Sequence, residues 1–153
     1  MATLDHKIPP PVIALACAGL AWALAHYTPE FAYPLPVRLP LAALLVLAGF
    51  ALDISGILVF RNAKTTVNPL SPDKSTSIVQ GGPYKFTRNP MYVGMAILLL
   101  AYCVYLASPV SAIAVVAFVA YITRFQIIPE ERLLLRKFGE TYASYTRSVR
   151  RWL

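Results

Sequence analysis

Long stretches without charged side chains alternate with short polar segments along the chain. Residues 8–29 contain no Asp, Glu, Lys or Arg, and Asp53 is the only one in residues 39–60. Residues 89–123 also lack them, but this stretch is too long for one membrane crossing and has Ser108-Pro109 near its middle. A span needs about 20 mostly apolar residues, so the stretch indicates two helices joined by a tight turn. The pattern therefore predicts four transmembrane helices, at about residues 11–27, 39–60, 90–107 and 109–128.

Two polar segments flank the last two predicted helices. Residues 61–88 are punctuated by Pro and Gly, which is typical of a structured loop. We expect Pro129 to end or kink the fourth helix. Beyond Pro129 an apolar stripe recurs at alternating spacings of four and three, formed by Phe138, Tyr142, Tyr145, Val149 and Trp152. The stripe predicts an amphipathic C-terminal helix, at about residues 129–151, over the cytoplasmic face, and Gly139 can divide this helix in two. The fold class is then all-α, with residues 1–153 as one membrane domain.

The composition and the charge distribution support this interpretation. Hydrophobic residues make up 58% of the chain and charged residues 14%, against roughly 25% charged in an ordinary soluble domain. The net charge is +7, and most basic residues lie in residues 61–88 or after the fourth helix. The positive-inside rule therefore places both termini and the 61–88 loop in the cytoplasm. Basic residues on that face favour membrane lipids as partners, not nucleic acid.

The N-terminal segment imitates a signal peptide. The apolar run Val12–Trp22 is followed by Ala23-Leu24-Ala25, which is similar to a small-residue cleavage site. Asp5 and the Pro9-Pro10-Pro11 run do not suit the basic region of such a peptide, so we expect the first helix to be retained.

The cysteines carry no metal or disulfide pattern. Cys17 and Cys103 both fall inside predicted spans, and the chain has no CxxC or Cys/His ligand spacing. We expect neither a metal site nor a disulfide, and we interpret both cysteines as packing residues.

Two polar segments at the cytoplasmic ends of the last two helices carry the candidate chemistry. Since those helices form a hairpin, Arg88-Asn89 and Glu130-Glu131 are expected at the same membrane face. A helix N-terminus beside an Arg attracts a carboxylate, and paired carboxylates attract a cation or hydroxyl groups. S-adenosylmethionine has both kinds of group, and Tyr84 and Tyr92 can offer it aromatic faces.

Each of these features also has a purely structural explanation. Asn89-Pro90 is a common helix start, and Pro129-Glu130-Glu131 suits the first turn of a helix. Gly81-Gly82-Pro83 forms turns, and Arg88 is an ordinary residue at a membrane border. Only their combination points to a ligand site.

The combined pattern resembles the isoprenylcysteine carboxyl methyltransferase and phospholipid methyltransferase superfamily. The resemblance covers roughly Asn62 to the C-terminus, and its motifs are Gly82-Pro83-Tyr84, Arg88-Asn89-Pro90-Met91-Tyr92-Val93-Gly94, Glu130-Glu131, and Phe138-Gly139 with Tyr142 and Tyr145. It implies an integral enzyme, of the bacterial cytoplasmic membrane in this case, whose lipophilic methyl acceptor enters from the bilayer.

The resemblance also implies the site residues. Arg88 and Glu131 are the catalytic candidates. The S-adenosylmethionine site would comprise Gly82, Pro83, Tyr84, Arg88, Asn89, Pro90, Tyr92, Gly94, Glu130 and Glu131. Many members have His at the position of Asn89, so a role in proton transfer does not carry over there, whereas capping or hydrogen bonding does.

The positions of the histidines indicate which kind of methyl acceptor the protein can use. His6 and His26 are the only histidines, and neither lies in these motifs. A carboxylate acceptor is ionised near neutral pH and needs no base, whereas a protonated amine needs one. We therefore expect an anionic acceptor, as in isoprenylcysteine O-methylation, with a phospholipid amine as the alternative.

Asp53, Tyr142 and Tyr145 are the candidate acceptor-binding residues. An ionisable group inside a span is costly and usually faces the bundle interior. Asp53 therefore lines the acceptor cavity, pairs with Arg88 or Arg124, or simply reaches the interface. Tyr142 and Tyr145 either close the pocket or anchor the terminal helix at the membrane surface.

The terminal arginines, Arg147, Arg150 and Arg151, are expected to bind lipid phosphates.

Two other classes of function also fit the sequence. A sterol-reductase-type enzyme, which would bind a nicotinamide cofactor, can carry a similar C-terminal pattern. A non-enzymatic scaffold would instead need partner chains, and we expect no obligatory protein partner.

Overall fold

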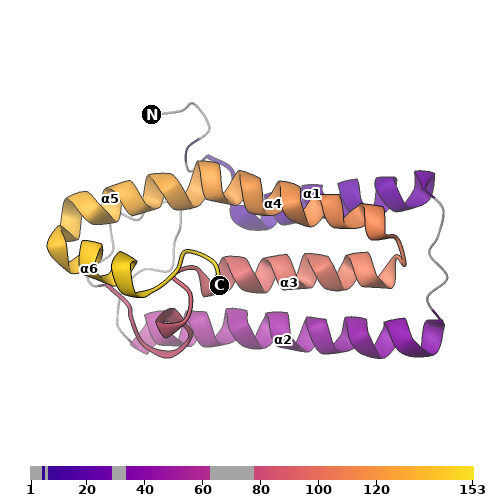
Figure 1. The fold of residues 1–153 in the computed structure, drawn as a ribbon, viewed down its shortest axis with the longest axis horizontal. Coiled ribbons are helices and arrows are strands. Elements are labelled where there is room, and N and C mark those ends of the chain that lie inside the picture. The colour runs from indigo at the N-terminus through magenta and orange to yellow at the C-terminus, as the bar shows by residue number, and fades with distance from the viewer. Residues whose placement is uncertain (1–4, 6, 29–33, 63–77) are drawn as a thin grey trace.

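The computed structural model describes residues 5, 7–28, 34–62 and 78–153, and its regular elements are helices (Figure 1). The predicted all-α fold is confirmed. Residues 63–77 of the predicted 61–88 loop lie outside the described residues. The elements are α1 (Pro10–Tyr27), α2 (Leu35–Asn62), the 3-10 helix η2 (Gly82–Lys85), α3 (Pro90–Tyr105), the 3-10 helix η3 (Pro109–Ala112), α4 (Ile113–Ile122), the π-helical turn η4 (Thr123–Ile127), α5 (Ile128–Phe138) and α6 (Glu140–Ser148).

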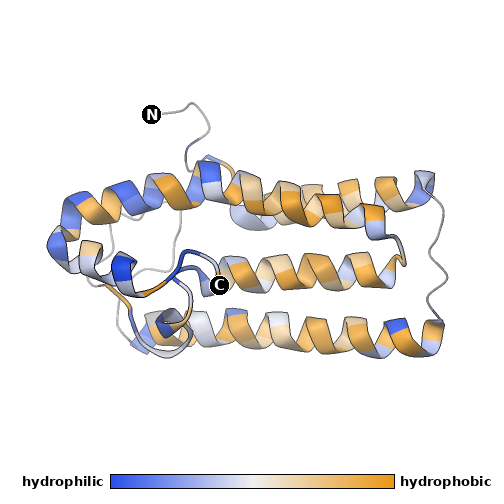
Figure 2. Ribbon diagram, in the orientation of Figure 1, coloured by the Kyte–Doolittle hydropathy of each residue, from blue (hydrophilic) through white to orange (hydrophobic). Residues whose placement is uncertain are grey.

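Three helical segments are long and apolar enough to cross a membrane, namely Pro10–Tyr27, Leu35–Val59 and Pro109–Phe138. The fourth apolar helix, α3, has 16 residues, which at about 1.5 Å per residue is roughly 24 Å long. Apolar side chains such as Leu44 and Leu47 are 63% and 68% exposed on α2. Outward-facing leucines of this kind are what a lipid-facing surface requires, and Figure 2 shows the hydrophobic colour running along the helices.

The helices run alternately along the bundle, with α3 lying between α2 and the α1–α4 pair (Figure 1). The largest fully buried apolar side chains, Phe118 and Ile122, come from α4 and pack with residues of α1 and α3. One end of the bundle carries η2, the start of α3, α5 and α6, and we call it the charged end. Hydrophilic residues concentrate there in Figure 2. The opposite end carries the start of α2 and η3.

The fourth helix does not end at Pro129, so of the two expected outcomes the structure shows a local disruption of the helix and not its end. A π-helical turn over Thr123–Ile127 leads directly into α5. Proline lacks an N–H and clashes with the carbonyl four residues earlier, and a shift of hydrogen-bond register by a π turn accommodates such a disruption. The side chain of Gln126 leaves this turn and donates a 2.7 Å hydrogen bond to the carbonyl of Ile8, which ties the N-terminal segment to the turn.

The predicted C-terminal helix over residues 129–151 is divided. Gly139 has a φ of +52° and separates α5 from α6, a backbone conformation that glycine adopts at little cost. The chain then extends from Val149. We call residues 149–153 the C-terminal strap.

Helices α2 and α3 approach closely because small residues line their contact. A Cβ added to Gly49 would lie 3.1 Å from the carbonyl oxygen of Gly94, and one added to Gly94 would lie 2.9 Å from that of Gly49. Asp53 and Gly56 follow Gly49 at spacings of four and three, so they share the same face of α2. Small residues allow such backbone approach in membrane helix pairs. This contact places Asp53 against the first turns of α3.

Candidate functional site

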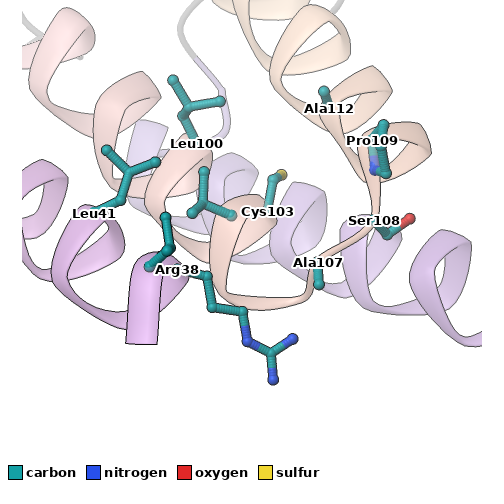
Figure 3. A pocket seen from close by; sticks show the side chains of 10 residues that line it. Arg38, Leu41, Leu100, Cys103, Ala107, Ser108, Pro109 and Ala112 are labelled. Atoms are coloured by element: carbon teal, nitrogen blue, oxygen red, sulfur yellow. The ribbon is translucent and has the colours of Figure 1, made fainter. Parts of the chain in front are cut away.

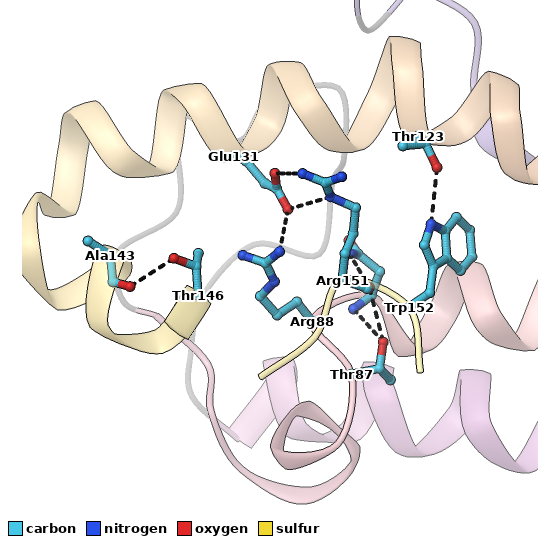
Figure 4. Close-up of polar contacts among 9 residues, drawn as sticks. Thr87, Arg88, Thr123, Glu131, Ala143, Thr146, Arg151 and Trp152 are labelled. Carbon is cyan, nitrogen blue, oxygen red and sulfur yellow. Dashed lines mark hydrogen bonds and ion pairs between the residues drawn. The ribbon is translucent and has the colours of Figure 1, made fainter. Parts of the chain in front are cut away.

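Arg88 and Glu131 meet directly at the charged end (Figure 4). Arg88 ends the segment between η2 and α3, and Glu131 lies in the first turn of α5. The Arg88 Nη2 atom is 3.0 Å from Glu131 Oε1, with side chains 10% and 17% exposed. The hairpin of α3 and α4 thus brings together the two positions that the sequence motifs had singled out.

A second guanidinium shares the same carboxylate. Arg151 in the C-terminal strap donates from Nε to Glu131 Oε1 at 3.0 Å and from Nη2 to Oε2 at 2.7 Å. Arg151 thus has a carboxylate partner within the protein, and its binding to lipid phosphate stays a prediction. Arg147 pairs with Glu140 on the exposed side of α6, so it too has a partner within the protein.

The strap is held by the segment that leads into α3. The backbone N–H of Arg88 donates to the carbonyl of Arg150 at 2.9 Å. The carbonyl of Arg151 accepts from Asn89 Nδ2 at 2.9 Å and from Thr87 Oγ1 at 3.2 Å. At the end of the strap, Trp152 Nε1 donates to Thr123 Oγ1 at 3.0 Å. The sequence interpretation missed these roles of Thr87 and Trp152, because no sequence pattern links Thr87 to Arg151 or Trp152 to Thr123.

Asn89 and Pro90 begin α3 as predicted, but the capping interaction is absent. Asn89 occupies the N-cap position without a side-chain capping bond, because its amide is turned toward the Arg151 carbonyl. Thr87 Oγ1 instead accepts a 3.2 Å hydrogen bond from the backbone N–H of Asn89. Asn89 is therefore a contact between α3 and the strap.

Four tyrosines form a buried wall beside the ion pair. Tyr84, Tyr92, Tyr142 and Tyr145 are each at most 6% exposed. The Tyr145 hydroxyl donates a 2.7 Å hydrogen bond to the carbonyl of Tyr84, which fastens α6 to η2. The two α6 tyrosines thus pack inward, and the alternative in which they anchor the helix at the membrane surface is wrong.

Burial keeps these hydroxyls protonated. It raises the pKa of Tyr145 to about 12. Burial, and to a smaller extent the carboxylate of Glu130, raises the pKa of Tyr84 above the usual range, and burial with the carboxylate of Glu131 does the same for Tyr142. The tyrosines therefore suit hydrogen-bond donation and not proton abstraction.

Gly82, predicted with Pro83 as a cofactor contact, lies where η2 packs against α2. Gly82 has a φ of +55°, and a Cβ there would lie 2.8 Å from Cγ2 of Val59. Gly56 plays the matching part on α2, where an added Cβ would lie 3.7 Å from the Tyr84 hydroxyl. These glycines bring the Tyr84 ring close to α2.

Asp53 lies against Gly94, where a Cβ would be within 2.1 Å of the Asp53 Oδ1 atom. Among the described residues Oδ1 is buried without a hydrogen-bond partner. Within the part of the chain that the structure describes, no ion pair joins Asp53 to Arg88 or Arg124, so the predicted pairing is wrong. Arg88 forms its ion pair with Glu131 instead.

The site therefore holds unsatisfied groups of both signs. The Arg88 Nε atom, like Asp53 Oδ1, is buried with no hydrogen-bond partner among the described residues. Glu130 forms no ion pair in the described part of the chain. Such buried groups are costly without a partner, so this end can bind a ligand that has both anionic and cationic groups. No cluster of three His, Cys, Asp or Glu suited to a metal occurs among the described residues.

These features define an integral membrane protein of the α-helical class with a polar site at one end of its bundle. Residues 37–141 match the model of the phospholipid methyltransferase family, so the chain belongs to that family and is a membrane methyltransferase by family. The match includes Asp53, Arg88 and Glu131. A Haemophilus influenzae protein described as "Uncharacterized protein" is 40% identical over 63 residues, which are 41% of this chain and all of that protein.

Proposed function

We propose that this protein transfers the methyl group of S-adenosylmethionine to a lipophilic acceptor in the membrane. The observation that carries the proposal is the Arg88–Glu131 pair at the end of a membrane bundle, with Arg88 Nε and Asp53 Oδ1 left without partners nearby. The cofactor would supply an electrophilic methyl group. Methyl transfer is an in-line displacement that depends mainly on positioning, so the residues of this chain have to hold the two reactants.

The residues at the charged end fit such a cofactor. Arg88 would bind its carboxylate through the donor that lacks a partner, and Glu130 would bind its ammonium or ribose. Tyr84 and Tyr92 would line the pocket. Glu131 is bound by two guanidinium groups, so Arg151 can neutralise it while Arg88 turns to a ligand. Arg151 therefore has a positioning role in the proposed site, because it holds Glu131 and leaves Arg88 available to the ligand.

The proposed acceptor is anionic, since the site contains no histidine base and its tyrosines are held protonated. A specific observation favours a second candidate, a lipid amine. Asp53 presents an unpaired carboxylate oxygen within the span, and a carboxylate attracts an ammonium and repels an anion. Asp53 would then accept the proton that an amine must lose.

We also propose that the charged end faces the cytoplasm, with both termini there, in a bacterial cytoplasmic membrane. The basic side chains at this end support that orientation through the positive-inside rule. A cofactor made in the cytoplasm would then reach the site without crossing the bilayer.

Methyl transfer from labelled S-adenosylmethionine into a total lipid extract tests the proposal. The purified full chain should place label in the lipid phase, and Glu131→Gln should abolish this, whereas Glu140→Gln, in an exposed pair, should not. Label that mild base releases as methanol identifies an ester and an anionic acceptor, whereas base-stable label identifies an amine. No transfer to any lipid, together with stabilisation by NADPH, would refute the proposal in favour of a reductase.

A further inference from the structure

A cavity of about 220 Å³ lies at the end of the bundle opposite the candidate site (Figure 3). It is enclosed by the start of α2, the end of α3 and η3, with Val37, Leu41, Leu100, Cys103, Ala107 and Ala112 among the residues that line it. Arg38, at its edge, precedes Asp53 by 15 residues on α2, a rise of about 22 Å. The cavity is therefore separate from the proposed methyl-transfer site.

The walls of this cavity are apolar and border the lipid-facing surface. Val37, Leu41 and Leu100 are 55%, 44% and 38% exposed, so the cavity borders on the surface that meets acyl chains. Cys103 is buried and its thiol is turned to the carbonyl of Ser111. Apolar cavities exclude water, and a cavity of about 150 Å³ already admits benzene. The occupant that suits this cavity is a hydrocarbon chain.

One cation stands at the edge of the cavity. Arg38 Nε is buried and has no hydrogen-bond partner among the described residues. The described residues of the cavity lining include no Asp or Glu, and Glu30 lies outside the described residues. In the described part of the chain Arg38 forms no ion pair. An apolar cavity with a guanidinium at its edge that has no ion-pair partner among the described residues is complementary to an amphiphile whose head group is anionic.

We propose that this cavity binds one acyl chain of an anionic phospholipid whose phosphate lies at Arg38. The lipid comes from the leaflet opposite the methyl-transfer site, so it is not the methyl acceptor. The charge at Arg38 selects the head group, and the apolar walls hold the chain.

Photo-crosslinking with two lipids of identical acyl chains tests this proposal. The full chain is placed in nanodiscs with phosphatidylglycerol or phosphatidylcholine that carries a diazirine in the half of the acyl chain near the head group. Labelled peptides are then mapped by mass spectrometry. We expect phosphatidylglycerol to label residues 98–112 about fivefold more than phosphatidylcholine does.

Two variants separate head group from chain. Arg38→Gln should lower labelling by phosphatidylglycerol to the level of phosphatidylcholine, whereas Arg38→Lys should keep the difference and Arg61→Gln, at the other end of α2, should leave it unchanged. Ala112→Leu fills the cavity and should remove labelling by both lipids, with Ala43→Leu on the exposed face of α2 as its control. Equal labelling by the two lipids in the wild type, or labelling that neither Arg38→Gln nor Ala112→Leu lowers, would overturn the proposal.

Discussion

The contact between α2 and α3 can be tested at Gly94. A methyl group there would lie 2.1 Å from Asp53 Oδ1 and 2.9 Å from the Gly49 carbonyl oxygen, both far inside ordinary contact distance. Overpacking of this kind costs about 1–3 kcal/mol. Replacing a helical glycine by alanine by itself stabilises the folded protein by about 0.5–1 kcal/mol. We therefore expect Gly94→Ala to destabilise the protein by about 1–2 kcal/mol.

Gly19 on α1 supplies the matched control, because a Cβ there meets nothing within 4 Å. Gly19→Ala should raise stability by about 0.5–1 kcal/mol, so the two alanine variants should move in opposite directions. Thermal unfolding in one detergent measures both, and each kcal/mol corresponds to roughly 2–4 °C in Tm.

A double variant locates the clash. Asp53→Ala removes the nearer of the two contacts, so Asp53→Ala/Gly94→Ala should be more stable than the sum of the single effects predicts. If Gly94→Ala were as stabilising as Gly19→Ala, the close approach of the two helices at Asp53 would be refuted.

Three further changes test the rest of the site. Arg151→Gln should weaken S-adenosylmethionine binding by tenfold or more, because Glu131 loses its second cation, whereas Arg147→Gln should leave it unchanged; equal effects in a binding titration would contradict this. Gly82→Ala should cost about 1–3 kcal/mol, since it combines a positive φ with an overlap on α2, and an unchanged Tm would show that η2 packs differently. Burial raises the pKa of Tyr145 to about 12, whereas a tyrosine in the unfolded chain has a pKa near 10. As the pH rises above about 9, the unfolded state therefore loses this proton first, and the free energy of unfolding falls. Tyr145→Phe should remove about 1 kcal/mol of the loss between pH 9 and 11, and parallel stability curves for the two proteins would argue against the buried hydroxyl.

The membrane helices were predictable from the sequence because the bilayer fixes their length and excludes charge. The same rule placed Arg88 and Glu131 at one end, since a hairpin of two spans returns the chain to its starting face. The continuation of the helix through Pro129 was not predictable, because it depends on the π turn at Thr123–Ile127. That turn is a choice of hydrogen-bond register, which the identity of a proline does not specify.

The partners at the site were harder to infer than the site itself. A basic residue near a membrane fits lipid phosphate and a protein carboxylate equally well, so Arg151 gave no signal that it contacts Glu131, 20 positions away. The apolar stripe of the C-terminal helix likewise does not reveal whether it faces lipid or protein. Tyr145 faces protein because Tyr84 offers it a carbonyl group. Such pairings depend on tertiary packing, which local periodicity does not encode.

The carboxylate of Glu131 and the guanidinium of Arg88 at the charged end form the proposed site for S-adenosylmethionine. Titration of the purified full chain with this cofactor tests it directly, with Glu131→Gln and Glu140→Gln compared side by side. Both substitutions remove a carboxylate that forms ion pairs with arginine, but Glu131 is 17% exposed and contacts Arg88 and Arg151, whereas Glu140 is 79% exposed and contacts Arg147. We predict saturable binding that Glu131→Gln weakens at least tenfold and Glu140→Gln leaves unchanged. Absence of binding to the wild type, or equal affinity in all three proteins, would contradict the account.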